Sequence, residues 1–176
     1  MRISVYIFFL SLISILMAGC DDPSKKEGKS TTGDNMEEIL VEVNKQLVKT
    51  EAQQIEDLIS RYGWEMEETG TGLRYVVLEK GNGAPCKKGK TVVMDYRVKL
   101  ISGLQVYSSE ESGPQSFEIG QGGVEAGLEE AMNFLHVGDK ARLIIPSHLA
   151  WGLSGDGKKI PPKATLIYEI KILDIK

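Results

Sequence analysis

The most informative part of this sequence is a run near its carboxyl end, Ile160-Pro161-Pro162-Lys163-Ala164-Thr165-Leu166-Ile167-Tyr168-Glu169-Ile170-Lys171-Ile172. Beyond the two prolines, apolar and polar residues alternate with the period of two that characterises a half-buried strand. We therefore predict a strand over residues 164–175. Glu169 and Lys171 are expected to face solvent, and the buried face is expected to carry Leu166, Tyr168, Ile170 and Ile172.

The same kind of patterning extends back along the chain to about residue 69. Further strands are predicted over residues 73–78, 91–100, 104–107, 115–119 and 141–145. A helix is predicted over residues 124–134, because Val124, Leu128 and Ala131 recur at the helical spacings of 4 and 3. Six strands and a single helix on an antiparallel sheet make an α+β domain.

A helical arm is predicted ahead of this domain, over residues 36–62. Its first apolar row, with spacings of 4, 3 and 4, consists of Met36, Leu40, Val43 and Leu47. The pattern continues with Ile55, Ile59 and Tyr62, and a capping-box sequence at Thr50 suggests that the helix restarts there. Such an arm either packs on the domain or pairs with a second copy to form a homodimer.

The first 19 residues have the pattern of a secretory signal peptide. Arg2 gives a positive start, residues 5–17 are mainly apolar, and small residues follow. The ending Leu16-Met17-Ala18-Gly19-Cys20 resembles a bacterial lipobox, whose cysteine is lipidated. Residues 20–35 are polar and predict a flexible tether. We expect a lipoprotein anchored to a membrane of the cell envelope and facing the periplasm or the exterior, with a plain signal peptide as the alternative.

The composition is that of an ordinary globular protein. Hydrophobic residues make up 41% and charged residues 26%, and 21 basic against 25 acidic side chains give a net charge of −4. A basic nucleic-acid-binding face is therefore not expected. Two cysteines exclude a disulfide-rich scaffold, and two histidines without ligand spacing argue against a zinc site. We predict no metal and no cofactor.

Two segments look like nucleotide-binding motifs, but their context argues against that function. Residues 84–91 fit a permissive phosphate loop, yet Thr91 opens a strand where a helix N-terminus is required. Residues 120–123 resemble a dinucleotide fingerprint, yet Glu125 occupies the third glycine position. Both histidines fall in predicted turns, and the sequence offers no convincing nucleophile, general acid or general base.

The order and spacing of the remaining motifs resemble the FKBP-type peptidyl-prolyl cis-trans isomerases over residues 69–176. The most specific pieces are Ile160-Pro161-Pro162-x-Ala164-Thr165-Leu166 and Val124-x-x-Gly127-Leu128-x-x-Ala131. The resemblance implies an antiparallel twisted sheet wrapping one short helix, and a rotamase that assists protein folding without a cofactor. An exported lipoprotein with a helical arm is similar to exported bacterial members of the family, some of which dimerise through that arm.

The resemblance also implies which residues form the substrate cup. The matches to catalytic positions are Tyr96, Trp151 and Tyr168. The matches to substrate-binding positions are Val106, Tyr107, Gln115, Val124, Glu125, Leu128 and Ile160. Val106 and Gln115 stand where the family has phenylalanines, and Leu128 stands where a tryptophan forms the floor. Tyr107 removes a carboxylate, and Glu125 stands where the family uses a backbone N–H. We expect a looser cup with a wetter rim, weak or narrow activity and poor binding of macrolide inhibitors.

The expected mechanism needs no covalent step. Rotation about an Xaa-Pro bond passes through a twisted, less polar amide, which an apolar cup favours over the planar form. The expected partners are proline-containing unfolded or exported polypeptides. Two other functions remain open: a catalytically weak peptide-binding chaperone on the same scaffold, and a subunit of an envelope or motility assembly.

Overall fold

The structure, a computed structural model, describes the backbone of residues 31–176 and the side chains from residue 36 onward. The predicted signal peptide, Cys20 and most of the predicted tether lie outside the described residues. The chain divides into two compact units, one ending at Val41 and the other spanning Glu42–Lys176. The sheet and the candidate site belong to the second unit.

A long helix, α2 (Thr31–Tyr62), precedes the sheet. It begins at Thr31, inside the predicted tether. The predicted restart at Thr50 is wrong, because α2 is continuous there. The Thr50 hydroxyl donates to the Gln46 carbonyl at 2.9 Å, one turn back, and so does not cap a new helix. Gly63, with a φ of 61°, ends the helix.

Within residues 31–176, seven antiparallel strands form one sheet in the order β1-β2-β6-β7-β3-β4, and β5 also pairs with β3. The strands are β1 (Glu67–Glu68), β2 (Arg74–Glu79), β3 (Thr91–Leu100), β4 (Gln105–Ser108), β5 (Gln115–Glu118), β6 (Lys140–Ile145) and β7 (Leu166–Ile175). The predicted strands are all present, with ends that differ by at most two residues. The short strand β1 was not predicted, because two glutamates carry no alternating pattern.

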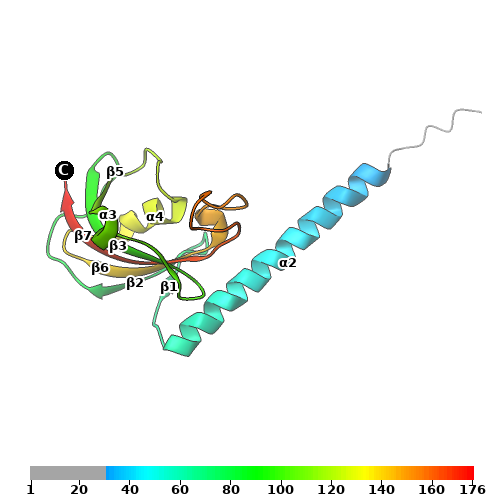
Figure 1. The fold of residues 1–176 in the computed structure, drawn as a ribbon, viewed down its shortest axis with the longest axis horizontal. Helices are drawn as coiled ribbons and strands as arrows, with labels where there is room; N and C mark the ends of the chain where they lie inside the picture. Colours follow the sequence, from blue (N-terminus) through cyan, green and yellow to red (C-terminus); the bar gives the residue numbers. More distant parts are fainter. Residues whose placement is uncertain (1–30) are drawn as a thin grey trace, which may run out of the picture. The chain divides into compact units, whose positions relative to one another are not determined.

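The short helix α4 (Ala126–Ala131) and the 3-10 turn η1 (Met132–Phe134) lie against one face of the curved sheet (Figure 1). Gly127 permits this close approach, because a Cβ at that position would lie 2.5 Å from Ile145 Cγ2 on β6. The predicted buried face of β7 is confirmed, but the opposite face is only partly open to solvent, because Ile167 is buried and Glu169 is half-buried. Lys171 is exposed, Glu169 pairs with Arg142, and the buried residues are Leu166, Tyr168, Ile170 and Ile172.

The last turns of α2 cover the opposite face of β6 and β7. Ile55 and Leu58 form a second buried cluster with Ile144 and Ile167. Burying each such side chain contributes about 1.5–3 kcal/mol. The prediction that the arm packs on the domain is therefore confirmed for its carboxyl-terminal end.

Polar contacts add to this packing. Glu51 of α2 accepts hydrogen bonds from the Ser147 N–H at 2.7 Å and from the Ser147 and Thr165 hydroxyls at 2.9 and 2.6 Å. Arg74 of β2 forms an ion pair with Glu56 at 2.9 Å.

The first apolar row of the arm remains exposed. No helix described here has the length and apolar character needed to cross a bilayer.

Candidate active site

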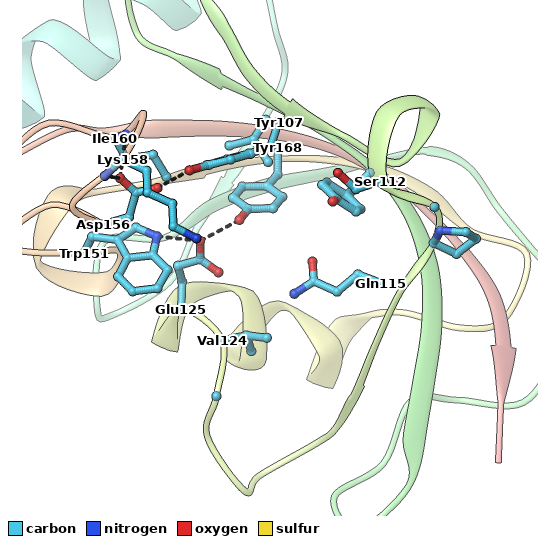
Figure 2. Close-up of a pocket in the computed structure, with 15 residues that line it drawn as sticks. Tyr107, Ser112, Gln115, Val124, Glu125, Trp151, Asp156, Lys158, Ile160 and Tyr168 are labelled. Carbon is cyan, nitrogen blue, oxygen red and sulfur yellow. Dashed lines mark hydrogen bonds between the residues drawn. The ribbon is translucent and has the colours of Figure 1, made fainter.

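A cavity of about 480 Å³ opens beside β3, β4 and β7 (Figure 2). Its other walls come from the segment between α3 (Ser109–Ser112) and β5, from the residues just before α4, and from the loop that follows η2 (Ser147–Leu149). The lining residues are Tyr96, Val98, Tyr107, Ser112, Gly113, Pro114, Gln115, Gly123, Val124, Glu125, Trp151, Asp156, Lys158, Ile160 and Tyr168. The cavity is therefore assembled from segments that are distant in the sequence.

The loop after η2 is held by hydrogen bonds and a close backbone contact among its own residues. Gly155 has a φ of +67°, and a Cβ there would lie 2.3 Å from the Ile160 carbonyl oxygen, so no side chain fits. Asp156 Oδ1 accepts the N–H groups of Lys158 and Ile160, both at 2.8 Å. The Asp156 N–H donates in turn to the Ile160 carbonyl at 3.1 Å. These contacts place Asp156 and Ile160 at the cavity wall.

Glu125 joins two of the predicted catalytic residues. Its Oε1 atom accepts the indole N–H of Trp151 at 2.9 Å and the hydroxyl of Tyr168 at 2.6 Å, as Figure 2 shows. Burial raises the pKa of Tyr168 well above its ordinary value, and the neighbouring Glu125 carboxylate adds to this effect. Tyr168 therefore stays protonated and remains a donor at neutral pH.

The expectation that Glu125 would lie at a wet rim is wrong. Only 8% of this residue is exposed. Trp151 and Tyr168 both donate to the same carboxylate oxygen, and these two bonds hold the side chain inside the cavity.

A second side-chain hydrogen bond connects β4 with the loop after η2. The Tyr107 hydroxyl donates to Asp156 Oδ2. Burial acts to raise the pKa of Asp156, but hydrogen bonds from Tyr107, Ile160 and Lys158 outweigh it and hold that pKa below its ordinary value. Tyr107 removes the family's carboxylate from β4, as expected, but Asp156 supplies another one from the loop after η2.

The structure brings most of the predicted site residues to the cavity. The lining includes Tyr96, Trp151 and Tyr168, and also Tyr107, Gln115, Val124, Glu125 and Ile160. Val106 and Leu128 are not among the lining residues, because both side chains are buried in the main core. The leucine at position 128 is smaller than the family's tryptophan and lies entirely within that core, 0% exposed. The structure therefore does not place the predicted cup floor at Leu128.

Seven lining residues were not predicted: Val98, Ser112, Gly113, Pro114, Gly123, Asp156 and Lys158. A signal for Asp156 existed, because an aspartate between two glycines commonly accepts hydrogen bonds from the backbone a few residues on. The sequence does not show that this loop reaches Tyr107 on β4. That contact depends on the tertiary fold.

Comparison with known proteins identifies the domain. Residues 83–173 match the family model described as FKBP-type peptidyl-prolyl cis-trans isomerase. This chain belongs to the FKBP family. FkpA from Escherichia coli K12 is 38% identical over 112 residues, which are 63% of this chain and 40% of FkpA. A probable FKBP-type isomerase from Haemophilus influenzae is 30% identical over 166 residues, which are 90% of this chain and 68% of the relative.

The structural comparison agrees with this assignment. The crystal structure of FkpA from Escherichia coli superposes on this FKBP-family chain with a TM-score of 0.64 and 27% identity, covering 98% of this chain and 81% of that one. The resemblance found in the sequence motifs is confirmed, and so is the expected fold. The cavity combines aromatic and aliphatic walls with fixed hydrogen-bonding groups, an arrangement suited to binding a peptide and changing its conformation.

Proposed function

We propose that this protein is a peptidyl-prolyl cis-trans isomerase acting on Xaa-Pro bonds of exported polypeptides. The observation that carries the proposal is the convergence of Tyr96, Trp151 and Tyr168 on one cavity of an FKBP domain, with Ile160 beside them. A volume of about 480 Å³ falls in the range of small-molecule sites and accommodates a proline ring with its flanking peptide groups.

The proposed mechanism is differential binding of the twisted amide. Rotation about the bond breaks amide resonance and meets a barrier of about 18–20 kcal/mol. The aromatic walls bind the ring and displace water, and an amide that has lost conjugation is less polar than the planar one. The twisted form therefore loses less on leaving water, and each 1.4 kcal/mol of preference for it is about tenfold in rate.

A direct test is the cis-to-trans rate of short Xaa-Pro peptides with the full chain in a protease-coupled assay. We expect acceleration that depends on the enzyme concentration, and a large loss in Trp151→Ala. A cis-to-trans rate equal to that of the uncatalysed peptide at every enzyme concentration would exclude isomerase activity.

A second candidate is peptide binding without efficient catalysis, as in a chaperone. The observation in its favour is a groove of about 570 Å³ between α2 and the segments 100–102 and 161–165, with apolar contributions from Leu47, Ile101 and Leu153. Suppression of aggregation of an unfolded client separates the two candidates. If the wild-type chain suppresses aggregation but never isomerises a peptide, the chaperone is the correct function.

We also propose export and lipid attachment at Cys20, which rest on the lipobox-like sequence alone. A multiply acylated cysteine anchors a protein stably, because each buried methylene contributes about 0.8 kcal/mol. Mass spectrometry of the membrane-associated protein should detect acylation at Cys20. The Cys20→Ser variant should lose it and leave the membrane fraction.

A homodimer formed through residues 36–62 is the remaining proposal. It is supported by the exposed apolar side chains of α2, which include Met36, Leu40, Val43 and Leu47. Packing the same row of a second helix against them removes this apolar surface from water.

A further inference from the structure

A buried carboxyl group at the cavity, that of Glu125, has no basic partner among the residues that the structure describes. Glu125 is more than nine-tenths buried, and its two donors, Trp151 and Tyr168, are neutral and both bind Oε1. Among the residues that the structure describes, Oε2 accepts no hydrogen bond, and no basic side chain lies within 4.0 Å of this carboxylate. Burying a carboxylate without a counter-charge is unfavourable.

Asp156 adds a second carboxylate to the same lining. Its partners, the Tyr107 hydroxyl and two backbone N–H groups, are also neutral. Its pKa lies below the ordinary value, because these hydrogen bonds outweigh the effect of burial, so it is ionised at neutral pH.

The lining contains a single basic side chain, that of Lys158. Lys158 is exposed, and within the described part of the chain it has no ion-pair partner at 4.0 Å or less. Its side chain can therefore turn out to solvent when a peptide enters. Two acidic groups against one displaceable lysine leave the occupied cavity with a net negative charge.

We propose that this cavity selects Xaa-Pro segments that carry a lysine or arginine next to the proline, and that Glu125 sets the preference. The inference rests on the isomerase function proposed above. A cationic side chain beside the proline ring can donate a charge-assisted hydrogen bond to the free Oε2 atom of Glu125. An acidic residue at the same place adds a further negative charge and is rejected, so the site discriminates by repulsion as well as by attraction.

The test compares peptides that differ only beside the proline, with lysine, leucine or glutamate placed either before or after it. Exchange NMR measures the isomerisation rate without a coupling protease. For wild-type full chain we expect the lysine peptide to exceed the leucine peptide by about tenfold in kcat/KM at one of the two positions, about 1.4 kcal/mol. The glutamate peptide should be the slowest.

Two variants with the same change in net charge locate the effect. In Glu125→Gln the ratio of lysine to leucine peptide should fall to about one, since the counter-charge is gone. Glu79 lies on β2 outside the cavity lining, so Glu79→Gln should keep the wild-type ratio. The ratio is internal to each variant, so loss of folded protein does not change it.

The outcomes separate this inference from the proposed function. Equal rates for the three peptides, or a lysine preference that survives in Glu125→Gln, overturn the inference and leave isomerase activity standing. If no peptide is isomerised, the isomerase function fails. Calorimetric titration of the same peptides then decides the preference, with tighter binding of the lysine peptide supporting it and equal binding overturning it.

Discussion

Trp151 depends on one specific contact for its place at the cavity, the hydrogen bond from its indole N–H to Glu125 at 2.9 Å. The side chain is 44% exposed, so it contributes little buried apolar surface to the core. We expect it to matter more for substrate binding than for stability.

Trp151→Phe should lower kcat/KM by about tenfold, because a ring that no longer donates to Glu125 is less firmly positioned at the cavity wall. The free energy of unfolding should change by less than about 1 kcal/mol. Isomerisation kinetics and urea unfolding measure the two effects.

Trp64→Phe is the matched control. Trp64 stacks on Tyr62 and lies under Arg142, outside the cavity lining, so kcat/KM should stay at the wild-type value. Undiminished activity in Trp151→Phe would show that the indole donor has no role.

The acid stability of the fold should depend on the Tyr107–Asp156 pair. The folded-state pKa of Asp156 is below its ordinary value, so the ionised form stabilises the fold above pH of about 3.9. This stabilisation is lost as the pH falls through the lower, folded-state pKa. Tyr107→Phe removes one of the hydrogen bonds that lower the pKa, so its stability should fall less steeply below pH of about 4. Urea unfolding at a series of pH values measures both slopes. Parallel curves for wild type and Tyr107→Phe would contradict the assignment.

At this scale, the sequence identified most positions around the cavity but not what their side chains do. Tyr96, Trp151 and Tyr168 belong to motifs with fixed spacing, so they could be placed in advance. The inward position of Glu125 follows from two donors on separate segments, and the role of Asp156 follows from a contact between a loop and β4. Neither contact has a local signature in the sequence.

Among the elements, the carboxyl-terminal end of α2 is the one about which the structure adds most to the prediction from sequence. Local periodicity was enough to predict six of the seven strands and a helix within 124–134, although the α-helix covers only Ala126–Ala131 and a 3-10 turn follows it. It could not show where α2 packs, because its apolar residues recur along the whole length and only tertiary contacts select Ile55 and Leu58. Glu51 also ties α2 to Ser147, at the start of the segment that carries Trp151.

Ile55→Ala should destabilise the fold by about 2–5 kcal/mol, because it leaves a cavity in the second buried cluster. Ile55 is 0% exposed, whereas Leu47 on the same helix is 42% exposed. The control variant Leu47→Ala should therefore change the free energy of unfolding by less than about 1 kcal/mol. Chemical denaturation measures both variants. A small effect of Ile55→Ala would mean that the end of α2 does not pack on the sheet in solution.

For the whole molecule, the exposed apolar side chains of α2 predict pairing with a second copy of the chain. Val43→Glu combined with Leu47→Glu places charge on this surface and leaves the docked residues Ile55 and Leu58 unchanged. We expect the wild-type chain to sediment as a dimer and the double variant as a monomer with the same activity per chain. A wild-type monomer at micromolar concentration would contradict the proposed dimer.

The central claim is that one cavity of this FKBP domain binds the Xaa-Pro bond and eases its rotation. The chain contains two tryptophans, Trp151 at the cavity and Trp64 away from it, so its two indole N–H signals report on both places in one sample. The most direct measurement is a titration of the ¹⁵N-labelled full chain with a Xaa-Pro peptide, with cis–trans exchange followed in the same tube. The account predicts that the Trp151 signal shifts, the Trp64 signal stays in place, and peptide exchange accelerates. Accelerated exchange with an unmoved Trp151 signal, or a shift confined to Trp64, would contradict it.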